Sequence, residues 1–165
     1  MQTSFEFDGQ SPDDLLEAFG RLSAVLADEL ERAALDIGLR YGGEAARNAP
    51  KDRGRLSSDL VEPVVERVGE ALIKVRVGSN TDQARPQEFG TDPFFPPPSE
   101  LRGWAGRVLG DEDAAFVVAR SISETGLEAQ EFLKGSFANE SNLVFAVNRI
   151  NEAIENAFSE VGFDI

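Results

Sequence analysis

The feature that most constrains this chain is a long stripe of apolar side chains with helical spacing. Ser11 and Pro12 suit the start of a helix, since serine caps helices and proline is tolerated in the first turn. Pro50 must end it, because proline inside a helix clashes with the preceding turn. Between these limits apolar residues recur at steps of three or four: Leu15, Phe19, Leu22, Leu26, Leu30, Ala33, Ile37, Tyr41 and Ala45. The sequence therefore predicts one helix of roughly 30 residues, about 45 Å long, that can pack on a sheet and extend beyond it.

Strand signals follow this helix. Residues 61–68 and 71–77 are rich in valine and isoleucine, and Gly69-Glu70 between them suits a two-residue hairpin turn. Pro63 places the first strand at a sheet edge. Residues 84–89 suggest a third strand interrupted by Pro86, and the alternation in residues 4–8 predicts another short strand.

The second half of the chain is predicted to be helical. After a stiff proline arm at 92–98, two helices follow, starting at Ser99 and Asp111 and ending at Gly110 and Gly126. A last helix opens at Asn139 or Ser141, and its apolar stripe is either core or a subunit contact: Leu143, Val147, Ile150, Ile154, Ala157, Phe158 and Val161. The predicted fold class is α+β, with a long N-terminal helix packed on a small antiparallel sheet, an inserted helical hairpin and a C-terminal helix. We expect a helix-plus-sheet core at 1–91, an inserted lobe at 92–131 and a C-terminal helical part of the core at 132–165.

The composition narrows the possible chemistry. The chain has no cysteine and no histidine, which removes thiol nucleophiles, imidazole bases and most zinc sites. The acidic groups at 13–14 and 111–113 fall at predicted helix starts, where the helix dipole explains them without catalysis or cation binding. We therefore predict no catalytic, cofactor-binding or metal-binding residues. The sequence shows neither an apolar run of about 18 residues nor a secretory signal, so we expect no membrane association.

The charge is strongly negative. Thirty acidic residues face 16 basic ones, which gives a net charge of −14, and only three of the basic residues are lysines. An acid-rich, lysine-poor surface is typical of proteins exposed to molar salt, where screening removes the repulsion between carboxylates. Binding of duplex DNA over a broad surface is disfavoured, since the chain has no excess positive charge.

Two turn motifs carry a resemblance to a known family. Residues 49–58 read Ala-Pro-Lys-Asp-Arg-Gly-Arg-Leu-Ser-Ser, and residues 88–91 read Glu-Phe-Gly-Thr. With the long helix before them and the hairpin between them, these motifs resemble the head–tail joining proteins of long-tailed phages, also called tail-completion or neck proteins. The later segments resemble the version of that family with a helical insertion, through Pro96-Pro97-Pro98, Trp104-Ala105, Gly110, Gly126 and Phe132-Leu133.

The resemblance implies a structural virion protein that catalyses no reaction and forms a ring, sixfold in symmetry, between head and tail. Its implied partners are further copies of itself, the head connector or adaptor, and the tail terminator or tail tube protein. Genomic DNA would pass through the ring without specific binding. The protein would lie in the neck or tail of the virion, and in the host cytoplasm during assembly. Together with the acidic composition, the resemblance suggests a tailed virus of a halophilic archaeon or bacterium.

The candidate subunit interface comprises residues of the two motifs and of the proline arm: Arg53, Arg55, Leu56, Glu88, Phe89, Gly90, Thr91, Phe94 and Phe95. The two arginines could hold carboxylates of a neighbouring subunit in bidentate pairs, or Arg55 could bond locally while Arg53 is solvated. Phe89 could instead lie in the core. Adjacent aromatics on a stiff loop seldom both reach one core, so we expect at least one of Phe94 and Phe95 on a neighbour. Trp104 is expected in the core of the lobe.

Two other classes of function remain open from the sequence. An acidic DNA mimic, or another soluble protein acting on a host DNA-binding protein, would be a monomer or dimer with regularly spaced carboxylates. An enzyme would require a concave pocket with convergent carboxylates.

Overall fold

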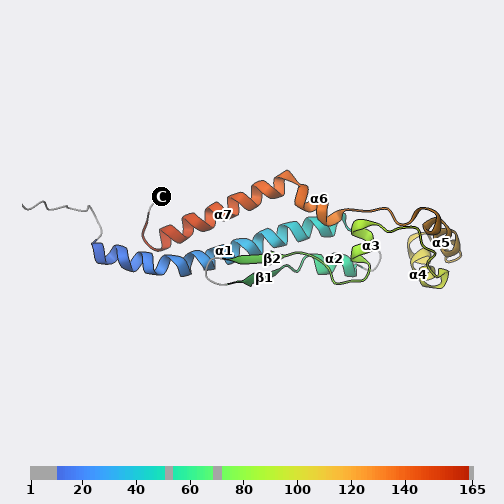
Figure 1. Ribbon diagram of the computed structural model, residues 1–165, viewed down its shortest axis with the longest axis horizontal. Helices are drawn as coiled ribbons and strands as arrows, with labels where there is room; N and C mark the ends of the chain where they lie inside the picture. The colour runs from blue at the N-terminus through green and yellow to red at the C-terminus, as the bar shows by residue number, and fades with distance from the viewer. Residues whose placement is uncertain (1–10, 51–53, 69–71, 164–165) are drawn as a thin grey trace, which may run out of the picture.

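The computed structural model describes residues 11–50, 54–68 and 72–163 of the chain. The molecule is elongated, with one long helix running through most of its length (Figure 1). The fold class is α+β, as predicted. The elements follow in the order α1 (Pro12–Asn48), α2 (Arg55–Leu60), β1 (Val64–Arg67), β2 (Ile73–Arg76), α3 (Ala84–Phe89), α4 (Pro98–Val108), α5 (Ala114–Thr125), α6 (Phe132–Ala138) and α7 (Glu140–Glu160).

Helix α1 begins and ends where the sequence indicates. The Asp14 backbone N–H donates to Ser11 Oγ at 3.2 Å, and the Ser11 N–H donates to Asp14 Oδ2 at 3.0 Å, so the two residues form a capping box. Ala49 is the C-cap and has an extended backbone, because the next residue is Pro50. The helix has 37 residues, which makes it about 55 Å long and longer than predicted.

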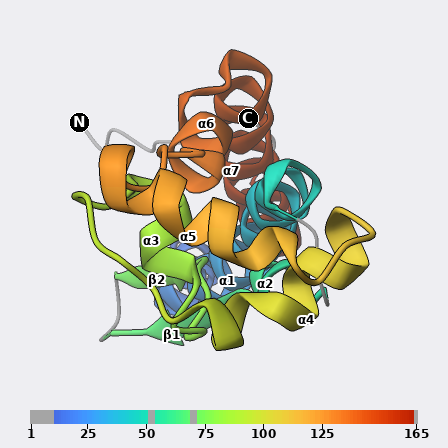
Figure 2. The same ribbon diagram turned by 90° about the vertical axis from the view of Figure 1, so that its right-hand side faces the viewer.

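Small residues let the neighbouring elements approach α1 closely. Helix α7 packs along one side of α1, and the hairpin of β1 and β2 packs along another (Figures 1 and 2). Ala33 on α1 and Ala153 and Ala157 on α7 are almost fully buried. On the hairpin side, a Cβ atom at Gly38 would lie 2.6 Å from Pro63 Cβ. Bulkier residues at these positions would force the layers apart.

The sheet consists of two antiparallel strands, each shorter than predicted. Val64 pairs with Arg76, Val65 with Val75, Glu66 with Lys74 and Arg67 with Ile73. The predicted turn at Gly69-Glu70 and the predicted strand at residues 4–8 lie outside the described residues.

The predicted third strand is wrong: residues 84–89 form helix α3. Pro86 does not break this helix, because it lies in the first turn, where backbone N–H groups have no intrahelical acceptor. In the sequence, a short run with a central proline resembles an interrupted strand. In the structure, this segment is held as a helix by contacts with the start of α6. The backbone N–H groups of Gln130 and Glu131 donate to the carbonyls of Gln87 and Glu88 at 2.8 and 3.2 Å.

Helices α4 and α5 pack against each other at one end of the molecule (Figure 2). Gly110 and Gly126 follow them with φ angles of 74° and 75°, as expected for residues that end helices. The starts differ from the predictions by one to three residues: α4 begins at Pro98 and α5 at Ala114, with Asp113 as its N-cap.

The apolar stripe of α7 is only partly core. Asn139 is the N-cap, as one of the two predictions had it, and its side chain accepts the Ser141 N–H at 2.9 Å. Ala157 and Val161 are buried, but Leu143, Val147 and Ile150 are exposed. None of the helices among the described residues is long and apolar enough to cross a membrane.

Candidate subunit interface

The first turn motif folds into the core of the subunit. Gly54 has a φ angle of 76° and precedes α2, and Ser57 Oγ donates to the Gly54 carbonyl at 2.9 Å. Leu56 is buried, and it belongs to the main apolar cluster with Ala45, Ala46, Ala49, Leu60 and Phe132. This motif therefore anchors the end of α1 to the chain that returns from α4 and α5.

Glu88 of the second motif is a buried structural carboxylate. Only 3% of its surface is exposed, and it accepts the backbone N–H groups of Leu133 and Lys134 at 2.8 and 2.9 Å. These donors lie in the first turn of α6 and have no intrahelical acceptor. The negative charge also lies at the positive end of the helix dipole. Glu88 thus caps α6 from a distant part of the sequence.

Gly90 and Thr91 hold together the two segments that connect α4 and α5 to the rest of the molecule. The Thr91 N–H donates to the Leu127 carbonyl at 3.0 Å, and the Leu127 N–H donates to Thr91 Oγ1 at 3.1 Å. Gly90 has a φ angle of 72°, and a Cβ there would lie 2.6 Å from the Leu127 oxygen. Gly126 is equally confined, because a Cβ there would collide with the Thr91 carbonyl oxygen. Both glycines are required by close approach as well as by backbone conformation.

Three aromatic residues of the candidate interface lie on the surface. Phe89 is 73% exposed, so the alternative that places it in the core is wrong. Phe94 and Phe95 are both exposed as well, and Phe95 makes an edge-to-face contact with the exposed ring of Phe116, with centroids 6.3 Å apart. Exposed aromatics this close in sequence and space are typical of protein contact surfaces.

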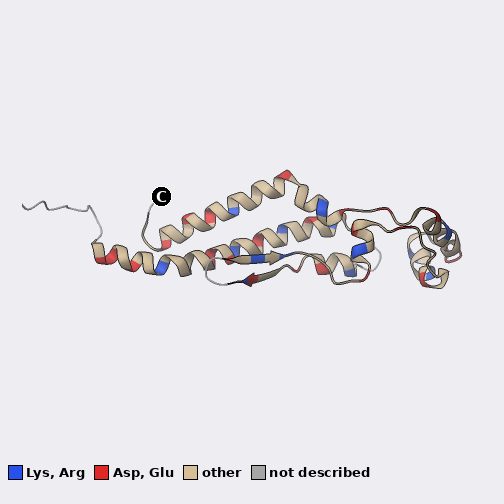
Figure 3. Cartoon of the chain, in the orientation of Figure 1, with Lys and Arg blue, Asp and Glu red and all other residues tan. Residues whose placement is uncertain are grey.

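Several basic residues lie where α1 ends and along α2 and α3 (Figure 3). Arg55 is exposed there with Arg47 and Arg85, and none of the three has an ion pair within the described residues. Arg53 lies outside the described residues. The predicted pairing of Arg53 and Arg55 with a neighbouring subunit stays a prediction.

An apolar groove lies between α2 and α3 on one side and helices α4 and α5 on the other. Its volume is about 580 Å³, and Arg55, Leu56, Phe94 and Trp104 are among the residues that line it. Trp104 is half-buried in this groove rather than fully enclosed among α4 and α5. Sequence spacing places Trp104 on the apolar face of its helix, but it cannot show that this face also borders the groove.

A buried polar network joins α1 to α7, and sequence reasoning missed it. Asn142 is fully buried; its Nδ2 donates to Glu44 Oε2 at 2.7 Å and to the Ser136 carbonyl at 3.0 Å. Arg40 Nε donates to Asn142 Oδ1 at 3.0 Å, and Ser136 Oγ donates to the Tyr41 carbonyl at 2.7 Å. The one feature of the sequence that points to the burial of Asn142 is its spacing. It lies three helical turns before Ala153 and therefore on the same face of α7.

Two arginines on the flanks of α1 hold its neighbours through ion pairs. Arg67 of β1 lies 2.6 Å from Asp28 and 2.8 Å from Glu31 of α1, and these bonds, that of Asp28 foremost, raise the pKa of its guanidinium. Arg149 of α7 lies 2.5 Å from Glu152 and 2.7 Å from Asp36, and its pKa is raised in the same way. These contacts orient the hairpin and α7 on α1.

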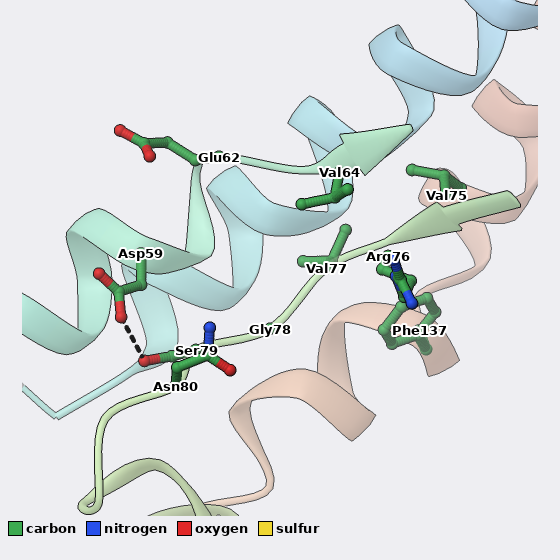
Figure 4. Close-up of a pocket in the computed structure, with 10 residues that line it drawn as sticks. All are labelled: Asp59, Glu62, Val64, Val75, Arg76, Val77, Gly78, Ser79, Asn80 and Phe137. Atoms are coloured by element: carbon green, nitrogen blue, oxygen red, sulfur yellow. Dashed lines mark hydrogen bonds between the residues drawn. The ribbon is translucent and has the colours of Figure 1, made fainter. Parts of the chain in front are cut away.

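A second groove lies beside β2 (Figure 4). Val77, Gly78 and Ser79 follow β2 along it, and Ser79 Oγ donates to Asp59 Oδ2 at 2.8 Å. Phe137 of α6 and Arg76 of β2 also line this groove. Among the residues that the structure describes, no cluster of three or more acidic side chains could hold a metal ion.

Comparison with known families gives a match for the first half of the chain. Residues 13–90 match a family model described as "Bacteriophage HK97-gp10, putative tail-component". The matched segment is just under half of the chain, and it spans α1, both turn motifs and the hairpin. The match supports a head–tail or tail protein of a tailed phage, which is a class of structural virion proteins. The curated proteins and the solved structures gave no match.

Proposed function

We propose that this chain forms a ring at the junction between head and tail and joins the DNA-filled head to the tail. The observation that carries the proposal is the position of the second motif. Glu88 and Thr91 fix the segment to α6 and to Leu127, and the same segment presents Phe89 to solvent. A rigid turn that exposes a phenylalanine is suited to contact with a neighbour, because little entropy is lost on binding.

The ring would be sixfold and would contact the head connector or adaptor on one side and the tail terminator or tail tube protein on the other. Subunit contacts would involve Phe89, Phe94, Phe95 and the arginines at 53 and 55. High salt weakens exposed ion pairs, so apolar and backbone contacts would supply most of the affinity.

The acidic charge suits a channel through which DNA moves. Carboxylates on the inner surface would repel the phosphates and keep DNA from binding during passage. The same composition suits a virus of a halophilic host, in whose cytoplasm the ring would assemble before it enters the virion. A density map of the ring with an arginine-lined channel would contradict the acidic lumen.

The decisive experiment is electron microscopy, in high salt, of lysates from a virus in which this gene is disrupted. Filled heads beside complete but unattached tails would establish a joining role. Normal joined particles would refute it and favour an acidic DNA mimic. Absent or overlong tails would keep the virion assignment but move the protein to tail termination or tube assembly.

A matched pair of variants tests the site itself. Phe89→Ser removes an exposed ring from the second motif, whereas Val117→Ser removes a similarly exposed apolar side chain from α5. Supplied from a plasmid, Phe89→Ser should fail to restore joined particles while Val117→Ser restores them. Equal rescue by both variants would remove Phe89 from the interface.

A further inference from the structure

The two-stranded sheet has a free edge that is ready to pair. The Val68 N–H donates to the Leu72 carbonyl at 2.6 Å, which, with the register, sets the hydrogen-bonded pairs of the hairpin at alternate positions. The N–H and C=O groups of Ile73 and Val75 therefore point away from β1. Within the described residues no backbone group bonds to them. A two-stranded hairpin is marginal alone, and an unpaired edge is a template for another strand.

The chain contains a segment with the pattern of the missing strand. Residues 4–8 read Ser-Phe-Glu-Phe-Asp, which places two aromatic side chains on one face of a strand and acidic side chains on the other. Strand β2 has the matching pattern. Ile73 and Val75 face α1, as the contact of Val75 with Gly38 shows, while Lys74 and Arg76 face outward.

This segment cannot reach the sheet of its own chain. Arg67, at the nearer end of the hairpin, contacts Asp28, which lies 17 residues along α1 from Ser11, or about 26 Å. Only Gly9 and Gln10 separate the segment from Ser11, and they allow at most about 11 Å of extended chain. The remaining gap along α1 is about 15 Å, which is longer than the Arg67 side chain that spans from the sheet to Asp28, so residue 8 falls short of the strands even at full extension.

We propose that residues 4–8 of one copy add as a third strand to the free edge of β2 in a neighbouring copy. The inference rests on the proposed self-assembly and supplies the element through which neighbouring copies join. Phe5 and Phe7 would then lie on the inner face, beside the groove that contains the 57% exposed Phe137. Glu6 and Asp8 would lie on the outer face beside Lys74 and Arg76.

Charge selects β2 rather than the other edge of the sheet. Lys74 is exposed and has no ion pair among the described residues, so it is available to an acidic strand. On β1 the equivalent outward position is Glu66, which would repel the same strand. A shift of register by one residue would turn both phenylalanines to solvent, so the apolar pattern fixes the face that the strand presents.

Disulfide trapping tests the pairing directly, because the chain has no cysteine of its own. Chains carrying Glu6→Cys are mixed with chains carrying Lys74→Cys, Arg76→Cys or, as the matched control, Glu66→Cys, which sits opposite Lys74 on β1. We expect a cross-linked pair of chains with Lys74→Cys or Arg76→Cys and at least a fivefold weaker one with the control. No cross-link to either β2 position, or equal cross-linking to the control, would overturn the proposal.

A second pair of measurements separates this proposal from that of the ring. A peptide of residues 1–10 should bind a chain lacking those residues, whose α1 still has its Ser11 cap, and Phe5→Ser with Phe7→Ser in the peptide should weaken binding at least tenfold. Reversing Lys74 to Glu should weaken binding about two- to fivefold, and a Glu6→Lys peptide should restore it. If full-length chains form rings but rings with both serine substitutions form equally well, strand addition is wrong and the ring stands. If the peptide binds while the full-length chain forms no ring, strand addition stands and the ring is wrong.

Discussion

Replacing Glu88 with alanine should destabilise the subunit through the loss of one buried cap. The carboxylate accepts two backbone N–H groups, those of Leu133 and Lys134, at 2.8 and 2.9 Å. A buried donor left without a partner costs about 1–3 kcal/mol. Both donors lie at a helix start where water can reach in part, so we expect a total loss of about 2–4 kcal/mol in the free energy of unfolding. For a chain of this size that corresponds to a fall in Tm of about 5–15 °C.

The assay is urea denaturation followed by circular dichroism, with Glu128→Ala as the control. Glu128 lies on the exposed segment just before α6, and its loss should change the free energy of unfolding by less than about 0.5 kcal/mol. Glu88→Gln retains one acceptor oxygen and should lose about half as much as Glu88→Ala. If Glu88→Ala and Glu128→Ala have the same stability, the carboxylate does not cap α6 and the account of the second motif fails.

Further predictions concern the glycines, the ion pairs, the helix cap and the exposed aromatic ring. Gly126→Ala should cost about 1–3 kcal/mol, measured by thermal unfolding, because its φ angle is positive and a Cβ would collide with an opposing carbonyl; an unchanged Tm would contradict this. Arg67→Ala should lower the Tm slightly at low salt and less in molar salt, because salt screens ion pairs between exposed groups; a larger loss of Tm in molar salt than at low salt would contradict this. The Ser11 side chain, and then its backbone N–H, lowers the pKa of Asp14 below its ordinary 3.8, so this cap is present above about pH 4 and is lost as the pH falls through the lowered pKa. The protection of the first-turn amides of α1, measured against the intrinsic exchange rate at the same pH, should fall in that acidic range, and Asp14→Asn should abolish the change. Phe89→Ser should leave the Tm within about 2 °C of the wild type, because the ring is exposed; a large fall would mean that its role is in folding.

The core residues of the candidate site show why spacing alone misleads. The sequence places Leu56 in the candidate interface, but it does not show that this side chain is buried in one cluster with Phe132, more than 70 residues away. The sequence places Glu88 in the same interface, but it does not show that this carboxylate caps a helix that begins at Phe132. Neither role can be derived locally, because the partner of each side chain is supplied by the segment that returns from α5.

The sequence by itself determined where α1 begins and ends, that two strands follow it, and the ends of α4 and α5. Each of these depends on interactions within a few residues: a capping serine, a proline, a glycine with positive φ, or an apolar period. The tertiary structure decided the rest. It made residues 84–89 a helix through bonds to the start of α6, it exposed the first half of the α7 stripe, and it buried Asn142 among polar partners from α1 and α6. A short segment has nearly equal free energies as strand or helix, so distant contacts of a few kcal/mol choose between them.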